Sequence, residues 1–240
     1  MSLHRNRGAK RAREAREELG LDSVAPLSCL LDCVEERAGL GVVVTRLPDG
    51  VAGACTSGPA PVLWLNAADA KVRQRFTLAH ELGHVRCKHD GKLVVESYET
   101  LSGATTTPRE IEANAFAAEF LIPRVAMEEL AVAGRNPTLD EVVVIAAHYG
   151  TSAIMTLYRF KQFGLADDAC VSSLGTVIEA KEHFAALERL GCSALPDRLG
   201  NLEELPYLSP PLRDSRLGAV LRGDAEAEPQ LATAIARVLS

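Results

Sequence analysis

The order of hydrophobic and polar positions divides the first half of the chain into helices and short strands. A charged helix is expected at 9–19, and a second helix at 28–38 would turn Leu30 and Val34 inward. Apolar runs bounded by turn sequences predict strands at 41–47, 51–56 and 61–65, and longer apolar runs predict helices at 68–89 and from 107 to about 130. A polar loop would span 90–106. This order predicts an α+β fold, mostly helical, with a small antiparallel sheet.

The next part of the chain carries the pattern of a helix-turn-helix. Two helices are expected at 139–148 and 152–163, joined by a turn at Gly150. Such a pair either reads DNA or serves packing. The second helix offers only Arg159 and Lys161 as cations, whereas its other large side chains are apolar and call for burial: Ile154, Met155, Leu157, Tyr158, Phe160 and Phe163. A recognition helix needs several exposed donors, so the pattern favours packing.

These patterns predict three parts of the chain. Residues 1–136 form the main domain, 137–168 a helix-turn-helix-like segment and 169–240 a C-terminal helical extension. Helical stretches at 177–190 and 229–239 flank a loop-rich centre in the extension. No motif there indicates a chemical role, so a regulatory appendage and a packing extension both remain open.

The segment FTLAHELGHV carries the clearest chemical signal. It places His80 and His84 four residues apart, on one face of a helix, where both imidazoles can reach one metal ion. Glu81 lies beside them, and the order His-Glu-x-x-His is typical of zinc-dependent peptidases. The helix is apolar around most of its circumference, and buried polar groups need partners such as a metal. Gly83 costs helix propensity, which predicts close approach of a neighbouring element.

A catalytic zinc site needs a third protein ligand, and the residues alone leave its identity open. Local candidates are Cys87, His89 and Asp90. The third residue after His84, where a glycine would let the chain turn back toward the metal, is Cys87. The other candidate is Glu110, which shares a helical face with Asn114, so that Glu110 would bind the metal and Asn114 would orient a ligand. Thr107-x-x-Glu110 is equally the pattern of a capping box, which would use Glu110 at the helix start.

Two motifs together, RFTLAHELGH and REIEANAFAAEFLIP, resemble the ImmA/IrrE family of bacterial metallopeptidases. The resemblance extends in weaker form over about 19–165. It implies a zincin-like core and identifies Glu110 as the third metal ligand, which leaves Glu112 and Glu119 outside the site. Members of that family cleave helix-turn-helix transcriptional repressors and thereby release genes of mobile elements or of stress responses. The resemblance thus implies a site-specific endopeptidase with a repressor as its protein partner.

The expected mechanism uses one Zn²⁺ per chain, with Mn²⁺ as the alternative metal. His80, His84 and Glu110 would hold the ion, and Glu81 would take the proton of the attacking water and return it to the departing amine. Tyr98 or His89 would supply a donor to the oxyanion. The alternative function is a DNA-binding or protein-binding regulator in which the zinc is structural.

Composition narrows the class of protein. With 240 residues and 47% hydrophobic content, the chain can bury a substantial core. Its net charge of -6 argues against DNA binding driven by overall charge. No apolar run is long enough to span a membrane, and the basic start LHRNRGAKRAREAREELG lacks the apolar core of a secretory signal. The six cysteines include no CxxC pair and predict reduced thiols, hence a cytoplasmic protein.

Overall fold

The computed structural model of the chain describes most of its length. Outside the described residues lie 1, 57, 59, 90–92, 102–104, 133, 193–194, 196, 201, 203–205, 225–232, 234–235, 237 and 239–240, together with the side chains of 93 and 94. In chain order the elements are α1 (Leu3–Glu18), α2 (Leu30–Asp32), the π-helix η1 (Cys33–Arg37), β1 (Gly41–Thr45), β2 (Val51–Thr56), β3 (Val62–Asn66), α3 (Lys71–Arg86), β4 (Leu93–Ser97), α4 (Pro108–Leu121), α5 (Arg124–Leu130), α6 (Leu139–Tyr149), α7 (Ala153–Gln162), α8 (Asp168–Glu179), α9 (His183–Arg189), β5 (Tyr207–Leu208), α10 (Pro210–Arg213) and α11 (Arg216–Arg222). The predicted α+β class is confirmed.

The sheet has five strands in the order β4-β2-β3-β1-β5. Neighbouring strands are antiparallel except β1 and β3, which run parallel with Gly41 opposite Val62. The sheet is therefore mixed, and the expectation of a purely antiparallel sheet is wrong. The reason is the position of β3, whose residues are all buried and which lies between β1 and β2 instead of following them. Two strands were not expected: β4 lies in the predicted polar loop, and β5 is very short.

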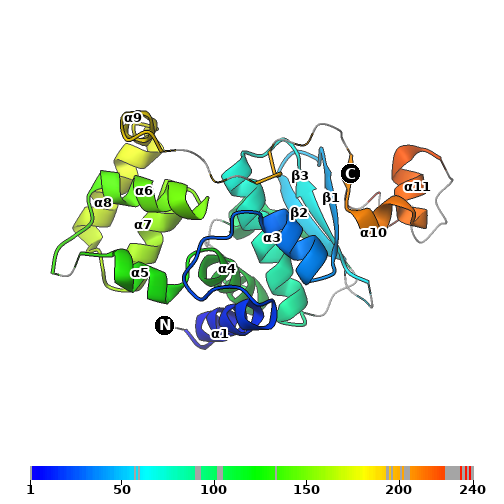
Figure 1. Cartoon of the computed structure of the whole chain (residues 1–240), viewed down its shortest axis with the longest axis horizontal. Coiled ribbons are helices and arrows are strands. Elements are labelled where there is room, and N and C mark those ends of the chain that lie inside the picture. Colours follow the sequence, from blue (N-terminus) through cyan, green and yellow to red (C-terminus); the bar gives the residue numbers. More distant parts are fainter. Residues whose placement is uncertain are drawn as a thin grey trace.

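Apolar residues cover both faces of the sheet. Val42 and Val44 join the apolar cluster that includes residues of α3 and α4, whereas Val43 joins a second cluster with Leu212 and Val238 from the end of the chain. This alternation follows from the two-residue period of a strand. Figure 1 shows the result, with α3 and α4 on one side of the strands and α10 and α11 on the other.

Helices α3 and α4 pack closely where α3 has no side chain. A Cβ atom on Gly83 would lie 3.1 Å from the Cβ of Phe116, so the predicted close approach at this glycine is confirmed. Helix α4 ends at Leu121, earlier than the sequence pattern indicated. Pro123 explains the break, because it lacks an N–H donor and favours an extended Ile122, whose ψ is 94°.

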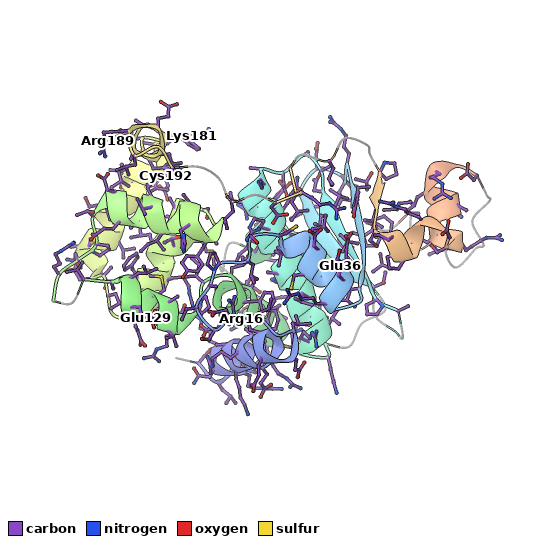
Figure 2. All side chains as sticks on the ribbon, viewed as in Figure 1. Arg16, Glu36, Glu129, Lys181, Arg189 and Cys192 are labelled. Atoms are coloured by element: carbon purple, nitrogen blue, oxygen red, sulfur yellow. The ribbon has the colours of Figure 1, made fainter. Side chains whose placement is uncertain are left out.

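Helix α1 lies along α4 and begins earlier than the predicted 9–19 (Figure 1). Gly8 makes the contact possible, because a Cβ there would lie 2.1 Å from the backbone oxygen of Glu112. Arg16 anchors the other end of α1, and Figure 2 shows it beside α4. Its guanidinium is 3% exposed and donates to the backbone oxygens of Phe120 and Asp22, at 2.6 and 2.5 Å.

The two helices expected after residue 137 are present as α6 and α7, with Gly150 at the turn in the left-handed conformation, φ 63°. Their buried and exposed positions differ from expectation. Tyr158, expected in the core, is 55% exposed, whereas Arg159, one of the two cations of this helix, is 2% exposed. Arg159 is buried because its Nη2 pairs with Glu119 Oε2 of α4 at 2.7 Å.

A second buried arginine joins distant parts of the chain. Arg75, near the start of α3, forms an ion pair with Asp197, and both side chains are fully buried. Arg75 also donates to the backbone oxygens of Gly150 and Leu27, at 2.9 and 2.8 Å. One guanidinium thus connects α3, the turn after α6 and two segments outside the helices.

The division at 136 and 168 stays a prediction. Helical structure near 177–190 occurs as the end of α8 and as α9, and most of the stretch predicted at 229–239 lies outside the described residues. Within the described part of the chain, none of the helices has the length and apolar character needed to cross a membrane.

We expect Arg159→Ala to lower the free energy of unfolding by about 3 kcal/mol, because it removes the arginine that pairs with the buried Oε2 of Glu119. Tyr158→Ala should change it by no more than about 0.5 kcal/mol, since that ring is exposed. Urea denaturation followed by circular dichroism measures both. A larger loss for Tyr158→Ala would contradict the assignment of buried and exposed sides.

Candidate metal centre

Helix α3 brings two imidazoles together in the interior. His80 and His84 are 0% and 3% exposed, and their Nε2 atoms lie 2.9 Å apart. One helical turn separates the two residues, which places both rings on the same face of α3. The two Nε2 atoms are directed at one buried point and could provide two ligands to one metal ion.

Helix α4 adds a carboxylate to the same point. Glu110 Oε2 lies 3.4 Å from His80 Nε2 and 3.1 Å from His84 Nε2. Its other oxygen accepts from Arg109 Nε at 2.8 Å. Thr107 makes no side-chain capping bond. The geometry therefore corresponds to the ligand interpretation of Glu110, and the capping box is not formed.

Asn114 lies one turn after Glu110 and orients the first imidazole. Its Oδ1 is 3.0 Å from His80 Nδ1, and its Nδ2 donates to the backbone oxygen of Thr100 at 2.8 Å. The amide is thus held from both ends. Because its oxygen can only accept, it favours the tautomer of His80 that carries hydrogen on Nδ1 and leaves Nε2 free to bind a metal.

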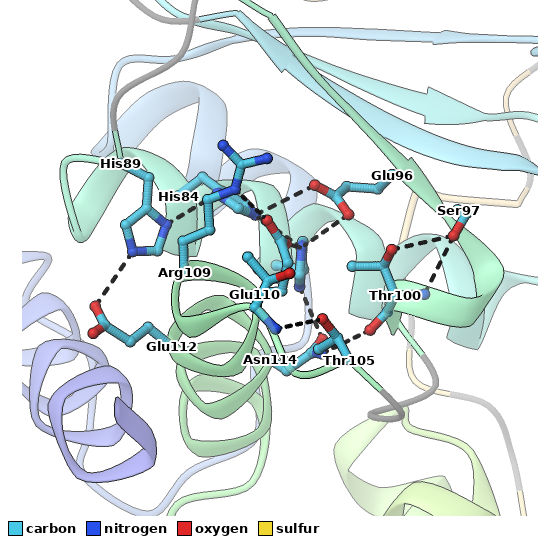
Figure 3. A network of polar contacts seen from close by, with 12 residues as sticks. His84, His89, Glu96, Ser97, Thr100, Thr105, Arg109, Glu110, Glu112 and Asn114 are labelled. Carbon is cyan, nitrogen blue, oxygen red and sulfur yellow. Dashed lines mark hydrogen bonds and ion pairs between the residues drawn. The ribbon is translucent and has the colours of Figure 1, made fainter. Parts of the chain in front are cut away.

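A fourth group, Glu96, was missed at the level of the sequence. It lies on β4, is 2% exposed, and its carboxylate oxygens approach His84 Nε2 to 3.6 Å and His80 Nε2 to 3.9 Å. Figure 3 shows Glu96 and Glu110 both directed toward His84, one from β4 and the other from α4. The sequence signal was weak. The run LVVE could have predicted a short strand, but nothing in it aligns that strand with the histidines.

The carboxylates of this cluster influence one another. Burial raises the pKa of Glu96 to about 8, and the neighbouring Glu110 adds to the shift. Burial also acts on Glu110, but the adjacent imidazoles of His80 and His84 hold the pKa of that carboxyl well below its usual range. Negative charge therefore concentrates at Glu110, at the common focus of the two imidazoles.

The donor set fits a metal ion. His80, His84, Glu96 and Glu110 each offer one ligand atom, and these atoms all lie within 4.8 Å of one another. Glu110 Oε2 has no hydrogen-bond donor within the described residues. Imidazole nitrogen and carboxylate oxygen are the ligands of catalytic zinc. The cluster can therefore hold a metal ion.

Glu81 lies next to the cluster and has a different environment. It is fully buried, and neither carboxylate oxygen has a hydrogen-bond partner in the described part of the chain. Gly53 of β2 gives it room, because a Cβ there would lie 3.1 Å from Glu81 Oε1. Burial, together with the charges of Glu96 and Glu110, raises the pKa of Glu81 well above its usual range. A cation bound at the cluster would lower the pKa of Glu81.

The other predicted site residues lie at the edge of the site or outside it. Tyr98 donates to Asp69 Oδ1 at 2.9 Å, and the structure shows no contact from it to the histidines. Cys87 and His89, the local ligand candidates, group instead with Glu112. Asp90 lies outside the described residues.

One comparison with known proteins bears on this centre. The chain matches the family model of Peptidase M78, described as the IrrE N-terminal-like domain, over residues 36–161, which is more than half of its length. The match contains His80, Glu81, His84, Glu96 and Glu110. No curated protein matches the chain. The resemblance seen in the two motifs is confirmed, and the chain belongs to the IrrE N-terminal-like family of peptidases.

Proposed function

We propose that the chain is a zinc-dependent endopeptidase with Glu81 as its catalytic base. The observation that carries this is the state of Glu81, a fully buried carboxylate with two unpartnered oxygens beside a cluster of metal ligands. An unpaired buried carboxylate destabilises a fold, so its presence calls for a functional reason. Membership of a peptidase family supports the same function.

In this mechanism His80, His84 and Glu110 hold the metal, and Asn114 keeps His80 in the binding tautomer. A metal held by these residues would supply Lewis-acid chemistry, polarising a peptide carbonyl and lowering the pKa of water toward about 7. Glu81 accepts the proton of the attacking water on its carboxylate and later returns it to the departing amine. Tyr98 would first have to leave Asp69 before it could donate to the oxyanion.

Two nitrogen and one carboxylate ligand form the set that catalytic zinc uses in peptidases, which supports Zn²⁺. Glu96 adds a second carboxylate to the cluster, and Mn²⁺ is the alternative because it favours oxygen ligands. All six cysteines are unpaired, in keeping with a protein that acts in the cytoplasm.

The proposed substrate is a helix-turn-helix repressor, on the basis of the family resemblance. Strand β4 supports a protein substrate, because it lies at the edge of the sheet, carries Glu96 at the metal cluster and leaves Val95 40% exposed. An extended peptide can add to such an edge beside the metal. Cleavage would remove the repressor and release the genes that it controls.

Binding of DNA by α7 is the weaker alternative. Arg159 is buried against Glu119, and Lys161 Nζ pairs with Asp168 Oδ1 at 2.8 Å. Buried Arg159 cannot contact phosphate, and the exposed Lys161 leaves α7 with a single cation, too few for such binding.

The test is direct. The zinc-loaded chain is incubated with each helix-turn-helix protein encoded beside its gene, and the products are identified by mass spectrometry. Cleavage of one of them at a single site, abolished by a chelator and restored by Zn²⁺, is the expected result. Intact proteins throughout would contradict the proposed substrate class.

Glu81→Gln should retain about one zinc per chain and lower the rate of cleavage by at least about 100-fold, because the amide cannot take a proton. Elemental analysis and a cleavage assay measure the two effects separately. Loss of zinc from this variant would show that Glu81 is a ligand and not the base.

Glu110→Gln should weaken zinc affinity by at least about 100-fold, and Glu96→Gln by no more than about 10-fold. The reason is distance, since Glu110 lies nearer than Glu96 to both Nε2 atoms. Competition with a chromophoric chelator gives both constants. The reverse order would make Glu96 the third ligand.

The chain should bind duplex DNA no more tightly than about 1 μM at physiological salt, and Lys161→Ala should leave that affinity unchanged, because α7 has only one exposed cation and the net charge of the chain is -6. Fluorescence anisotropy over a range of salt concentrations measures it. Nanomolar binding that Lys161→Ala abolishes would favour the DNA-binding alternative.

A further inference from the structure

The two imidazoles of the metal centre have different partners behind them. His80 Nδ1 faces the neutral amide of Asn114. His84 Nδ1 lies 3.0 Å from His89 Nδ1, and His89 Nε2 lies 3.3 Å from Glu112 Oε2. Figure 3 shows His89 between His84 and Glu112. A second histidine and a carboxylate thus stand behind only one of the two ligands.

The end of α3 explains how His89 reaches this place. Lys88 has a φ of 55°, the left-handed conformation that turns a chain back at a helix end. The backbone N–H of His89 then donates to the oxygen of His84 at 3.0 Å. This turn folds the His89 ring against His84, where its side chain is only 9% exposed.

His84, His89 and Glu112 form a row of three side chains, and the hydrogen atoms in this row have one consistent assignment. If His84 binds metal through Nε2, its Nδ1 carries hydrogen and donates to His89 Nδ1. The Nε2 of His89 then carries hydrogen and donates to Glu112, a carboxylate that can only accept. Each group has the partner that it needs, and the row ends in a negative charge.

Helix α1 holds the far end of the row. Glu112 Oε1 lies 2.8 Å from His4 Nδ1 and 3.1 Å from Arg7 Nη1. Helix α1 therefore fixes the carboxylate of Glu112 in position.

We infer that His89 and Glu112 are positioning residues of the metal centre, which fix the tautomer and orientation of His84 and increase its strength as a metal ligand. The inference rests on one part of the proposed function, namely that His80, His84 and Glu110 bind a metal ion. Glu112 stays outside the set of metal ligands, as the family resemblance implies, and would act on the site only through His89. Partners of this kind commonly change metal affinity by about 10-fold to 100-fold.

The experiment measures metal binding by the full chain, without a substrate. Zn²⁺ affinity is obtained by competition with a chromophoric chelator, and the visible absorption spectrum of the Co²⁺ form reports the geometry at the ligands. We expect His89→Ala and Glu112→Gln each to weaken Zn²⁺ binding by about 10-fold or more and to shift the Co²⁺ spectrum. His89→Gln, whose amide can both accept from His84 and donate to Glu112, should recover most of the affinity.

Glu119→Gln is the matched control. Glu119 is also a buried glutamate of α4 that pairs with α1, through Arg13, but it has no contact with the histidines among the described residues. Glu119→Gln should lower the melting temperature of the metal-free chain and leave Zn²⁺ affinity and the Co²⁺ spectrum unchanged. Equal losses of affinity in Glu112→Gln and Glu119→Gln would reduce Glu112 to a structural role and overturn the inference.

Other outcomes are also decisive. Wild-type affinity and spectrum in both His89→Ala and Glu112→Gln would overturn the inference while leaving the proposed peptidase intact. Two zinc ions per chain, one of them lost in Glu112→Gln, would mean that Cys87, His89 and Glu112 form a second metal site, and would overturn it as well. A wild-type chain that binds no zinc would overturn the proposed function itself, together with this inference.

Discussion

Gly83 lets Phe116 of α4 approach the backbone of α3, and the metal centre depends on that short distance. A Cβ atom at Gly83 would lie 3.1 Å from Phe116, so that Phe116 would have to give by a few tenths of an ångström and α4 could be displaced from α3. Glu110 lies on α4 and the histidines on α3, so such a shift would separate a carboxylate from the two nitrogens that it now approaches to 3.1 and 3.4 Å. Gly8 serves the same purpose on the other side of α4, where it admits α1. Two glycines thus set the spacing of three helices.

Close packing also buries acidic side chains. Those that stabilise the fold have an arginine partner, whereas two at the candidate metal site have none among the described residues. Glu112, Glu119 and Asp197 each pair with at least one arginine. Glu81 and Glu96 have no arginine or lysine partner within the described residues, although both are buried. A fold stabilises buried charge by pairing it, so the exceptions mark the place where a cation from outside the chain is needed. Burial and the neighbouring Glu110 raise the pKa of Glu96, whereas the two histidines lower the pKa of Glu110 against the effect of its own burial.

The sequence pattern predicted the features that depend on neighbouring residues within one helix or turn. The spacing of His80 and His84, the break that Gly150 makes and the close approach at Gly83 all follow from single residues or from helical periodicity. The parallel pairing of β1 with β3 did not follow, because it depends on which strand is buried deepest. Glu96 was missed for a similar reason, since strand pairing across the sheet brings it to the histidines. In α7 the hydrophobic pattern could not distinguish Tyr158 from Arg159, because the burial of Arg159 depends on Glu119 of another helix.

Helical periodicity predicts the direction of Glu112 but not the contact that this residue makes with His89. Glu110 and Asn114 share one face of α4, and Glu112 points about 200° away from Glu110 around the helix, which placed it outside the site. The structure confirms those directions, since Glu112 faces α1 and Glu110 faces α3. What periodicity could not include is the turn at Lys88, which carries His89 past the end of α3 to a position between His84 and Glu112. Helix α4 therefore contacts the metal centre from two of its faces, directly through Glu110 and indirectly through Glu112.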